Sequence, residues 1–317
     1  MGLHASFKSL LFPLKIDNYY LKDKTIAIDA YIVLYKLLTT AVKQDGSPYL
    51  LDGKNVSHII GFSWSYKKFF TKLNINPIFV FDGKPIPEKY EEINRRKENK
   101  NIAQKQYEEA SLEGNIEDMK KYSIRTTKIN YDIVKSFKDY LSVLGYSYVD
   151  AVHDGEALAT ELVNKGIADY ALTQDTDAIL YNCNSILRNM QLNESGSSDI
   201  VSTKRILENT GLNLDQLIYL GIITGTDYNQ GIKGIGANKG LKYVENKNSI
   251  EEVADSLIND SKIYFEDRNT IISKYKRTYD IFKETQDIKE TDIIKGVADR
   301  EKEKELISKI YSQNKSD

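Results

Sequence analysis

Seven acidic residues, far apart in the sequence, lie beside apolar runs or at the starts of expected helices. They are Asp29, Asp82, Asp154, Glu156, Asp175, Asp177 and Asp227. The stretch LTQDTDAILY (172–181) is the most telling, because Asp175 and Asp177 interrupt an apolar run that predicts a buried strand. Burying a charged carboxylate costs free energy unless a positive charge lies beside it. For Asp29 and Asp154 taken singly, helix capping is the simpler interpretation.

The predicted elements bring these acids together. Residues 24–38 and 76–83 each read as a strand followed by an acid, and strands that alternate with helices predict a mostly parallel sheet. In an open parallel sheet the carboxyl ends of the strands gather at one edge. So many carboxylates at one edge repel each other unless cations lie between them, and oxygen ligands without His or Cys favour Mg²⁺ or Mn²⁺. Two such ions, about 3.5–4 Å apart, support phosphodiester hydrolysis.

Composition narrows the class of protein. The 317 residues include one cysteine, Cys183, and three histidines, which exclude an internal disulfide and leave little for zinc or a His-based triad. No apolar run is long enough to span a bilayer, and the N-terminus lacks a signal-peptide pattern, so we expect an intracellular protein, in the cytoplasm or nucleoid if it is prokaryotic. The net charge of −2 hides a basic stretch between Lys84 and Lys128. We expect one large domain with a smaller appendage.

Local patterns predict the other elements. The polar stretch from Glu88 to about Arg125, broken at 111–115, predicts two long solvated helices. An amphipathic helix is expected over 131–145, a short strand over 146–151, a helix over 153–166 and a hairpin over 189–202.

The series IAIDAY, VFDGKP, DGEA, TQDTDAIL, GTDYN and GIKGIG resembles the flap endonuclease branch of the structure-specific 5′ nucleases, especially the archaeal ones. The resemblance covers almost the whole chain. It implies an α/β fold with a central, mostly parallel twisted sheet flanked by helices, an inserted helical arch and a helix–two-turn–helix motif for DNA. As a single nuclease domain over 1–317, the chain would comprise an N-terminal region (1–83), the arch (84–130), an internal region (131–228) and the helix–two-turn–helix with C-terminal helices (229–317).

The resemblance also implies roles for residues. All seven acids match the family's metal ligands for two Mg²⁺ ions, which Mn²⁺ can replace. Lys89 and Arg96 match two cations that contact the scissile phosphate, and their spacing of two helical turns places them on one helix face. Ordinary solvated charges are the alternative for this pair. Tyr35 matches a tyrosine that stacks on a base, with a core-facing aromatic as the alternative, and Arg188 matches a basic residue near the site.

The glycine-spaced stretch GIKGIGANKG resembles the family's duplex-binding turn. Glycines let the backbone approach phosphates closely, and the next helix offers its N-terminal amides. The carbonyls of Gly231, Ile232 and Ile235 match a site for a monovalent cation, such as K⁺. The residues expected to contact DNA, including a family N-terminal glycine, are Gly2, Lys233, Gly234, Gly236 and Lys239.

Two departures from the family matter. Asp154 stands where most relatives have a glutamate, so its reach to a metal ion is shorter by one methylene. The C-terminal stretch EKELISKIYSQNKSD lacks the box by which relatives bind the sliding clamp, so clamp recruitment has no support. We expect a monomer that acts on branched DNA with a 5′ flap in replication and repair, and also as a 5′-exonuclease. A junction-binding scaffold with weak catalysis and a nuclease that prefers bubbles or four-way junctions are the alternatives.

Overall fold

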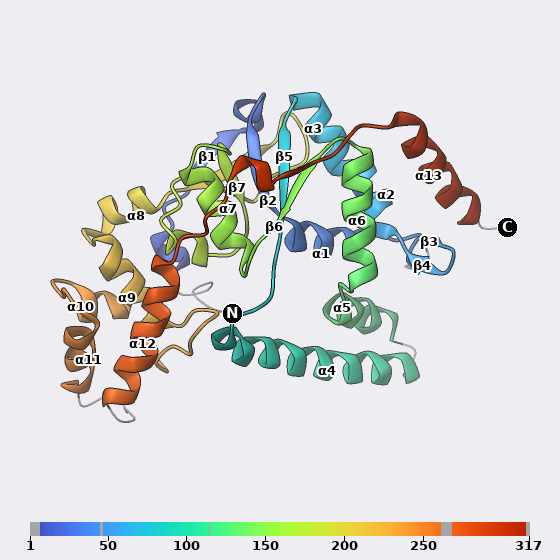
Figure 1. The fold of residues 1–317 in the computed structure, drawn as a ribbon. Coiled ribbons are helices and arrows are strands. Elements are labelled where there is room, and N and C mark those ends of the chain that lie inside the picture. Colours follow the sequence, from blue (N-terminus) through green and yellow to red (C-terminus); the bar gives the residue numbers. More distant parts are fainter. Residues whose placement is uncertain (1–6, 45–46, 114, 261–267, 315–317) are drawn as a thin grey trace.

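A mixed eight-stranded sheet forms the centre of the fold in the computed structural model, which describes residues 7–44, 47–113, 115–260 and 268–314 (Figure 1). The strand order is β1-β9-β8-β7-β2-β5-β6-β10. From β8 to β6 the neighbours are parallel, whereas β1, β9 and β10 pair antiparallel at the edges. The expected parallel sheet is thus confirmed for its central strands, and a separate hairpin is formed by β3 and β4. The strands are β1 (Leu14–Asp17), β2 (Thr25–Asp29), β3 (Leu50–Leu51), β4 (Lys54–Asn55), β5 (Asn76–Phe81), β6 (Ser147–Asp150), β7 (Tyr170–Leu172), β8 (Ile186–Arg188), β9 (Ser197–Val201) and β10 (Ile294–Lys295).

Helices cover both faces of the sheet and extend from it (Figure 1). They are α1 (Ala30–Thr40), α2 (Ser57–Phe62), α3 (Lys68–Leu73), α4 (Tyr90–Leu112), α5 (Ile116–Thr126), α6 (Tyr131–Val143), α7 (Gly155–Asn164), α8 (Thr203–Thr210), α9 (Leu214–Thr224), α10 (Ala237–Val244), α11 (Ile250–Ile258), α12 (Arg268–Lys283) and α13 (Arg300–Gln313). No helix within the described ranges is both long and apolar enough to cross a membrane.

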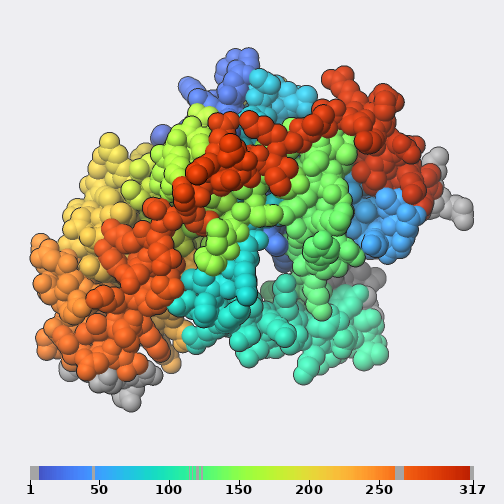
Figure 2. Space-filling view, viewed as in Figure 1, coloured from blue at the N-terminus to red at the C-terminus, as the bar shows by residue number. Residues whose placement is uncertain are grey.

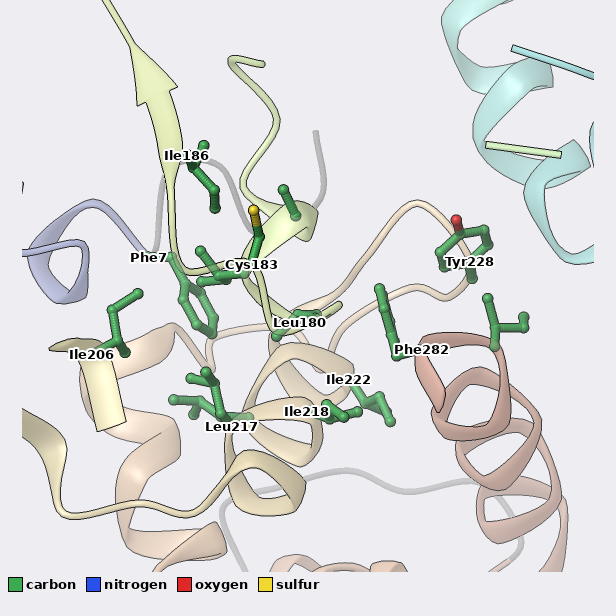
Figure 3. Packing of buried hydrophobic residues seen from close by; sticks show 14 of the residues in the cluster. Phe7, Leu180, Cys183, Ile186, Ile206, Leu217, Ile218, Ile222, Tyr228 and Phe282 are labelled. Atoms are coloured by element: carbon green, nitrogen blue, oxygen red, sulfur yellow. The ribbon is translucent and has the colours of Figure 1, made fainter. Parts of the chain in front are cut away.

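Two hydrophobic cores lie on opposite faces of the sheet. Because side chains alternate along a strand, β5 sends Ile78 and Val80 to one core and Phe79 and Phe81 to the other. The first core includes Cys183 and the apolar side of α9 (Figure 3), and the second is rich in aromatic residues. Each fully buried large apolar side chain contributes roughly 1.5–3 kcal/mol, so the two cores anchor the central strands firmly.

The predicted pair of solvated helices is confirmed as α4 and α5. Only Ala103 and Ala110 of α4 are buried, and the side chain of Asn115 caps α5 by accepting a hydrogen bond from the amide of Asp118. This cap explains the break at 111–115. Figure 2 shows an opening between the start of α4, in cyan, and α6, in green. The helices α4 and α5 thus form an arch beside the sheet.

The apolar run around Asp175 is not the long strand that the sequence predicted. β7 ends at Leu172, and residues Asp177–Ile179 form a short 3-10 helix. The Thr173 hydroxyl accepts a hydrogen bond from the amide of Asp175, and the Asp175 carboxylate accepts one from the amide of Asp177. Side chains that bond the backbone two residues ahead compete with sheet pairing, which explains why the strand stops.

A buried histidine in the second core makes stability depend on pH. His58 is fully buried, its Nε2 lies 2.9 Å from the hydroxyl of Ser136, and its Nδ1 has no hydrogen-bond partner among the described residues. Burial lowers the pKa of His58 from 6.5 to about 3. The folded protein therefore holds this ring neutral where the unfolded chain would take up a proton.

We predict that the stabilising effect of a neutral His58 is fully present above pH 6.5 and is lost as the pH falls toward 3. Between pH 7.5 and 5 this loss amounts to about 2 kcal/mol of unfolding free energy. Urea unfolding of His58→Gln across this range should show a shallower dependence on pH than the wild type. His153→Gln, at an exposed histidine, is the control. Parallel pH profiles for the wild type and His58→Gln would refute the prediction.

Candidate active site

Parallel strands deliver three of the seven acids to one edge of the sheet. Asp29 is the last residue of β2, Asp82 follows β5, and Asp175 follows β7. These strands are neighbours, so their carboxyl ends coincide. Asp29 also caps α1, because its Oδ1 accepts hydrogen bonds from the amides of Tyr31 (2.9 Å) and Ile32 (3.3 Å). Capping and membership of the acidic cluster are therefore compatible in this residue.

The start of α7 adds two more acids, Asp154 before the helix and Glu156 in its first turn. The amide of Gly155 donates a 2.8 Å hydrogen bond to Oδ1 of Asp82, which ties the start of α7 to the end of β5. A Cβ atom at position 155 would lie 2.8 Å from the same oxygen, so only glycine fits without a shift. Asp154 occupies the capping position of α7, but its side chain makes no capping bond. The capping interpretation therefore holds for Asp29 and is wrong for Asp154.

Asp227 joins the cluster from the end of a helix. It follows the end of α9 rather than a strand, and its backbone amide donates to Oδ2 of Asp177 over 3.3 Å. A turn closed by the Thr226 and Asn229 backbones holds this segment. The motif GTDYN thus marks a helix exit that projects its aspartate toward the sheet edge.

A pocket of 570 Å³ opens at this edge. Its lining includes the acids Asp29, Asp82, Glu156, Asp175 and Asp227 together with Tyr35, Lys89 and Arg96. Asp154 and Asp177, both buried, are absent from that lining. The structure therefore brings all seven predicted acids into one cluster, five of them at the pocket surface and two beneath it.

Two cations from the base of the arch enter the cluster. The ammonium of Lys89, which is buried, forms an ion pair with Asp154 and lies 3.8 Å from Oδ2 of Asp227. The Arg96 guanidinium donates to both oxygens of Asp227, at 2.8 and 2.7 Å. Lys89 ends a short 3-10 helix that runs into α4, so both residues project from the same side of the arch base. Lys89 is therefore not an ordinary solvated charge, whereas Arg96 is half exposed and is held by its ion pair with Asp227.

The pKa values of the acids in the cluster reflect burial first and repulsion between the carboxylates second. Desolvation raises the pKa of Asp29 to about 7, with the negative charge of Asp82 as the next cause. Desolvation and then the charge of Asp175 raise the pKa of Glu156 and of Asp177 well above their ordinary values. Burial by itself lowers the pKa of Lys89, but the carboxylates of Glu156 and Asp154 outweigh it and the net shift is upward. The cluster therefore favours added positive charge.

The donor set fits hard divalent cations. Every candidate ligand is a carboxylate oxygen, and Oδ1 of Asp177 is buried without a hydrogen-bond partner in the described part of the chain. As the side chains stand, no three Asp, Glu, His or Cys residues among those described are grouped closely enough to hold one ion. Lys89 and Arg96 instead supply the nearest positive charges, so an ion must share the carboxylates with them.

The arch base is less basic than the residue count indicated. Glu92 accepts hydrogen bonds from both Arg95 and Arg96, and Glu88 pairs with Arg277 of α12 at 2.7 Å. Glutamates interleaved with the cations neutralise much of this face. The prediction of a basic arm was therefore too simple for the end of the arch nearest the site.

The other residues predicted to contact DNA near the site differ in how exposed they are. Tyr35 is partly exposed in the pocket, and its hydroxyl donates to the Ile124 carbonyl of α5 over 2.9 Å. Arg188 is buried at the end of β8, and burial lowers its pKa. Its side chain has little surface to offer to DNA in this arrangement. Gly2 lies outside the described residues.

The glycine-rich loop between α9 and α10 is tightly folded. A Cβ atom at Gly231 would lie 2.2 Å from the Thr224 carbonyl oxygen, and Gly234 has a φ of +82°. The Ile232 carbonyl accepts a hydrogen bond from the Ile235 amide, and the exposed Lys239 donates to the Gly234 carbonyl over 3.3 Å. Lys233, Gly234 and Lys239 are exposed. The loop thus presents backbone and two ammonium groups to solvent.

Sequence reasoning missed two tyrosines of the site. The Tyr228 hydroxyl donates to Oδ2 of Asp154, and the Tyr181 hydroxyl lies 2.5 Å from that of Tyr228. Tyr228 stands directly after Asp227 in GTDYN, which is the one signal that could have drawn attention to it. Tyr181 ends the stretch LTQDTDAILY and reads there as a core residue.

Known proteins agree with this architecture. Residues 1–103 match the XPG N-terminal domain and residues 145–227 match the XPG I-region. The chain is 34% identical to a Flap endonuclease 1 of Methanobrevibacter smithii over 76% of its own length and 74% of that protein. A Flap endonuclease 1 of Saccharolobus solfataricus is 35% identical over 74% of this chain and 71% of that protein.

Solved structures give the same result. The flap endonuclease-1 from Methanococcus jannaschii superposes with a TM-score of 0.64 at 26% identity, over 96% of this chain and 97% of that one. The catalytic core of Rad2 in complex with DNA substrate superposes with a TM-score of 0.71 at 25% identity, over 99% and 95% of the two chains. Members of this family generally depend on divalent metal ions. The chain belongs to the flap endonuclease family of DNA-hydrolysing nucleases.

Proposed function

We propose that this protein cuts 5′ flaps where single-stranded DNA meets duplex, and that it acts more weakly as a 5′-exonuclease in replication and repair. Two sets of relatives support the proposal, those named flap endonuclease and a Rad2 core bound to DNA substrate. The observation that carries it is a pocket in which Lys89 and Arg96 face a cluster of carboxylates beside the arch. A phosphodiester needs both kinds of charge around it during hydrolysis.

The carboxylates divide into groups by their position. Asp29, Asp82, Glu156, Asp175 and Asp227 border the pocket, Asp177 has a buried oxygen without a partner among the described residues, and Asp154 contacts Lys89. The six acids other than Asp154 would hold the divalent ions, Mg²⁺ with Mn²⁺ as a substitute, which when bound lower the pKa of water and stabilise charge on phosphate oxygens.

The two cations of the arch base would bind the scissile phosphate. Arg96 can present its planar fork to two phosphate oxygens, and Lys89 supplies a point charge. In the resting arrangement both lie on carboxylates. Phosphate would compete with Asp227 for Arg96, whereas the Lys89 ammonium has three N–H donors and can contact phosphate while it stays on Asp154. Tyr35, at the pocket rim, would offer its ring to a base next to the cut.

Duplex DNA would bind at the loop between α9 and α10. Lys233 and Lys239 are exposed there and would contact phosphates, while Gly234 and Gly236 allow close approach of the backbone. The carbonyls of Gly231, Ile232 and Ile235 would hold a monovalent cation such as K⁺ between loop and DNA. Arg188 would act from beneath the site through its charge near Asp175 and Asp199 rather than by surface contact.

The direct test is cleavage of an end-labelled 5′-flap substrate in Mg²⁺, compared with bubble and four-way junction substrates. We expect cuts near the flap junction at a rate well above that on the other two. Tight binding of an uncut flap in Mg²⁺ would support the scaffold alternative instead, and faster cleavage of bubbles or junctions would reassign the substrate.

We predict that Asp175→Ala lowers the single-turnover cleavage rate by about 10³-fold, because it removes a ligand at the centre of the cluster. Flap binding, measured by fluorescence anisotropy in Ca²⁺, should stay within severalfold of the wild type. Asp139→Ala, which removes an exposed aspartate paired with Lys135, is the matched control. Normal cleavage by Asp175→Ala would contradict its role as a ligand.

Arg96→Ala should slow single-turnover cleavage about 10²-fold, because a bidentate contact to the phosphate is lost. The neighbouring Arg95 forms its ion pair with Glu92 rather than with Asp227, so Arg95→Ala should change the rate by less than about threefold. Equal losses in the two variants would show that the arch base contributes general charge rather than a specific contact.

Asp177→Asn should raise the melting temperature of the metal-free protein at pH 8 by several degrees. The pKa of Asp177 is raised, so its charge costs stability at any pH above its unfolded value, and asparagine removes that charge while keeping an oxygen for the Asp227 amide. Added Mg²⁺ should stabilise the wild type more than the variant. A lower melting temperature for metal-free Asp177→Asn would mean that repulsion in the cluster is already relieved.

A further inference from the structure

Both oxygens of Asp154 are occupied by side chains of this protein. Oδ1 accepts a hydrogen bond from the ammonium of Lys89, and Oδ2 accepts one of 2.5 Å from the hydroxyl of Tyr228. Asp154 is 5% exposed and does not line the pocket that the other acids border. Its contacts therefore point to Lys89 and Tyr228 rather than to the open side of the site.

A second tyrosine continues the chain of hydrogen bonds. The hydroxyls of Tyr181 and Tyr228 lie 2.5 Å apart. An ionised carboxylate only accepts hydrogen bonds, so the single proton of Tyr228 is committed to Asp154 and Tyr181 must donate to Tyr228. Hydrogen bonds in such a chain polarise each other in a buried setting, which strengthens the bond that reaches Asp154.

Packing fixes both rings. Phe282 of α12 lies with its ring centroid 4.9 Å from that of Tyr181 and 5.4 Å from that of Tyr228, and Figure 3 shows the hydroxyl of Tyr228 directed away from Phe282. The backbone of Asp154 is held as well, because the Gln286 side chain donates to its carbonyl over 3.1 Å. Phe282 thus packs against the rings of both tyrosines.

Tyr228 also contacts Lys89 directly. The Lys89 ammonium lies 5.8 Å from the centroid of the Tyr228 ring, within the range of a cation–π contact. The same tyrosine thus fixes the carboxylate that pairs with Lys89 and presents its ring to the ammonium. An aspartate, shorter than glutamate, is well suited to this inward contact.

We propose that Tyr228, supported by Tyr181, is a positioning residue that holds Asp154 as the anchor of Lys89, so that Asp154 orients the ammonium toward the scissile phosphate. The inference rests on the proposed nuclease function. It assigns Asp154 a task different from that of the five acids at the pocket surface, and it gives the two tyrosine hydroxyls a part in the reaction without contact to DNA.

The test is a double-mutant cycle with Tyr228→Phe and Tyr181→Phe, which remove only the hydroxyls and keep the rings on Phe282. Single-turnover flap cleavage in Mg²⁺ should fall about tenfold in Tyr228→Phe and about threefold in Tyr181→Phe. The double variant should match Tyr228→Phe within about twofold, because Tyr181 acts through Tyr228. Flap affinity in Ca²⁺ and Mg²⁺ affinity by titration calorimetry should both change by less than about threefold.

Tyr279→Phe is the matched control. Its hydroxyl also donates to an aspartate, Asp215 of α9, over 2.8 Å. This variant should lose a similar hydrogen bond with a rate within about twofold of the wild type.

Three results would overturn the inference. They are an unchanged rate in Tyr228→Phe, multiplicative losses in the double variant, and a loss of Mg²⁺ affinity that accounts for the slower rate. The last result would make Asp154 a metal ligand instead. Failure of the proposed function is distinguishable, because the wild type itself would then leave the flap uncut.

Discussion

Repulsion between carboxylates at the edge of a parallel sheet is the constraint on which the rest of this structure depends. Adjacent parallel strands end at the same level, so acids placed after β2, β5 and β7 cannot avoid one another. Desolvation, followed by repulsion from Asp82, raises the pKa of Asp29 to about 7. Cations must therefore come to this edge, and the base of the arch supplies two of them, Lys89 and Arg96.

The cores make such an unfavourable edge tolerable. Apolar side chains on both faces of the central strands hold the strand ends in place, although the carboxylates there repel each other. Stability and chemistry are thus separated in space, with burial on the two faces and charge at one end. The separation explains why a charge in the site can be unfavourable for folding and still persist, since active sites often cost stability that a core supplies.

Much of this arrangement was predictable, because the signals are local. A β-branched strand followed by an acid predicted Asp29 and Asp82 at the sheet edge, and the polar stretch with its break at 111–115 predicted α4 and α5. Fold class followed from the alternation of strands and helices. One prediction failed for a local reason too, because the strand before Asp175 ends early where Thr173 and Asp175 bond the backbone ahead. The sequence also left open how Asp227 is positioned, and the structure places it after a helix, α9.

What the sequence could not reveal are the partners of each charge. Tyr228 is separated from Asp154 by 74 residues and from Tyr181 by 47, and no periodicity connects them. Likewise, a count of lysines and arginines cannot tell that Glu92 engages Arg95 and Arg96, while Lys89 is buried against Asp154. In a cluster of seven acids, the role of each residue follows from which of its oxygens is already taken. By that criterion we infer different roles for Asp177, one of whose buried oxygens has no partner among the described residues, and for Asp154, both of whose oxygens are engaged, although their side chains are chemically the same.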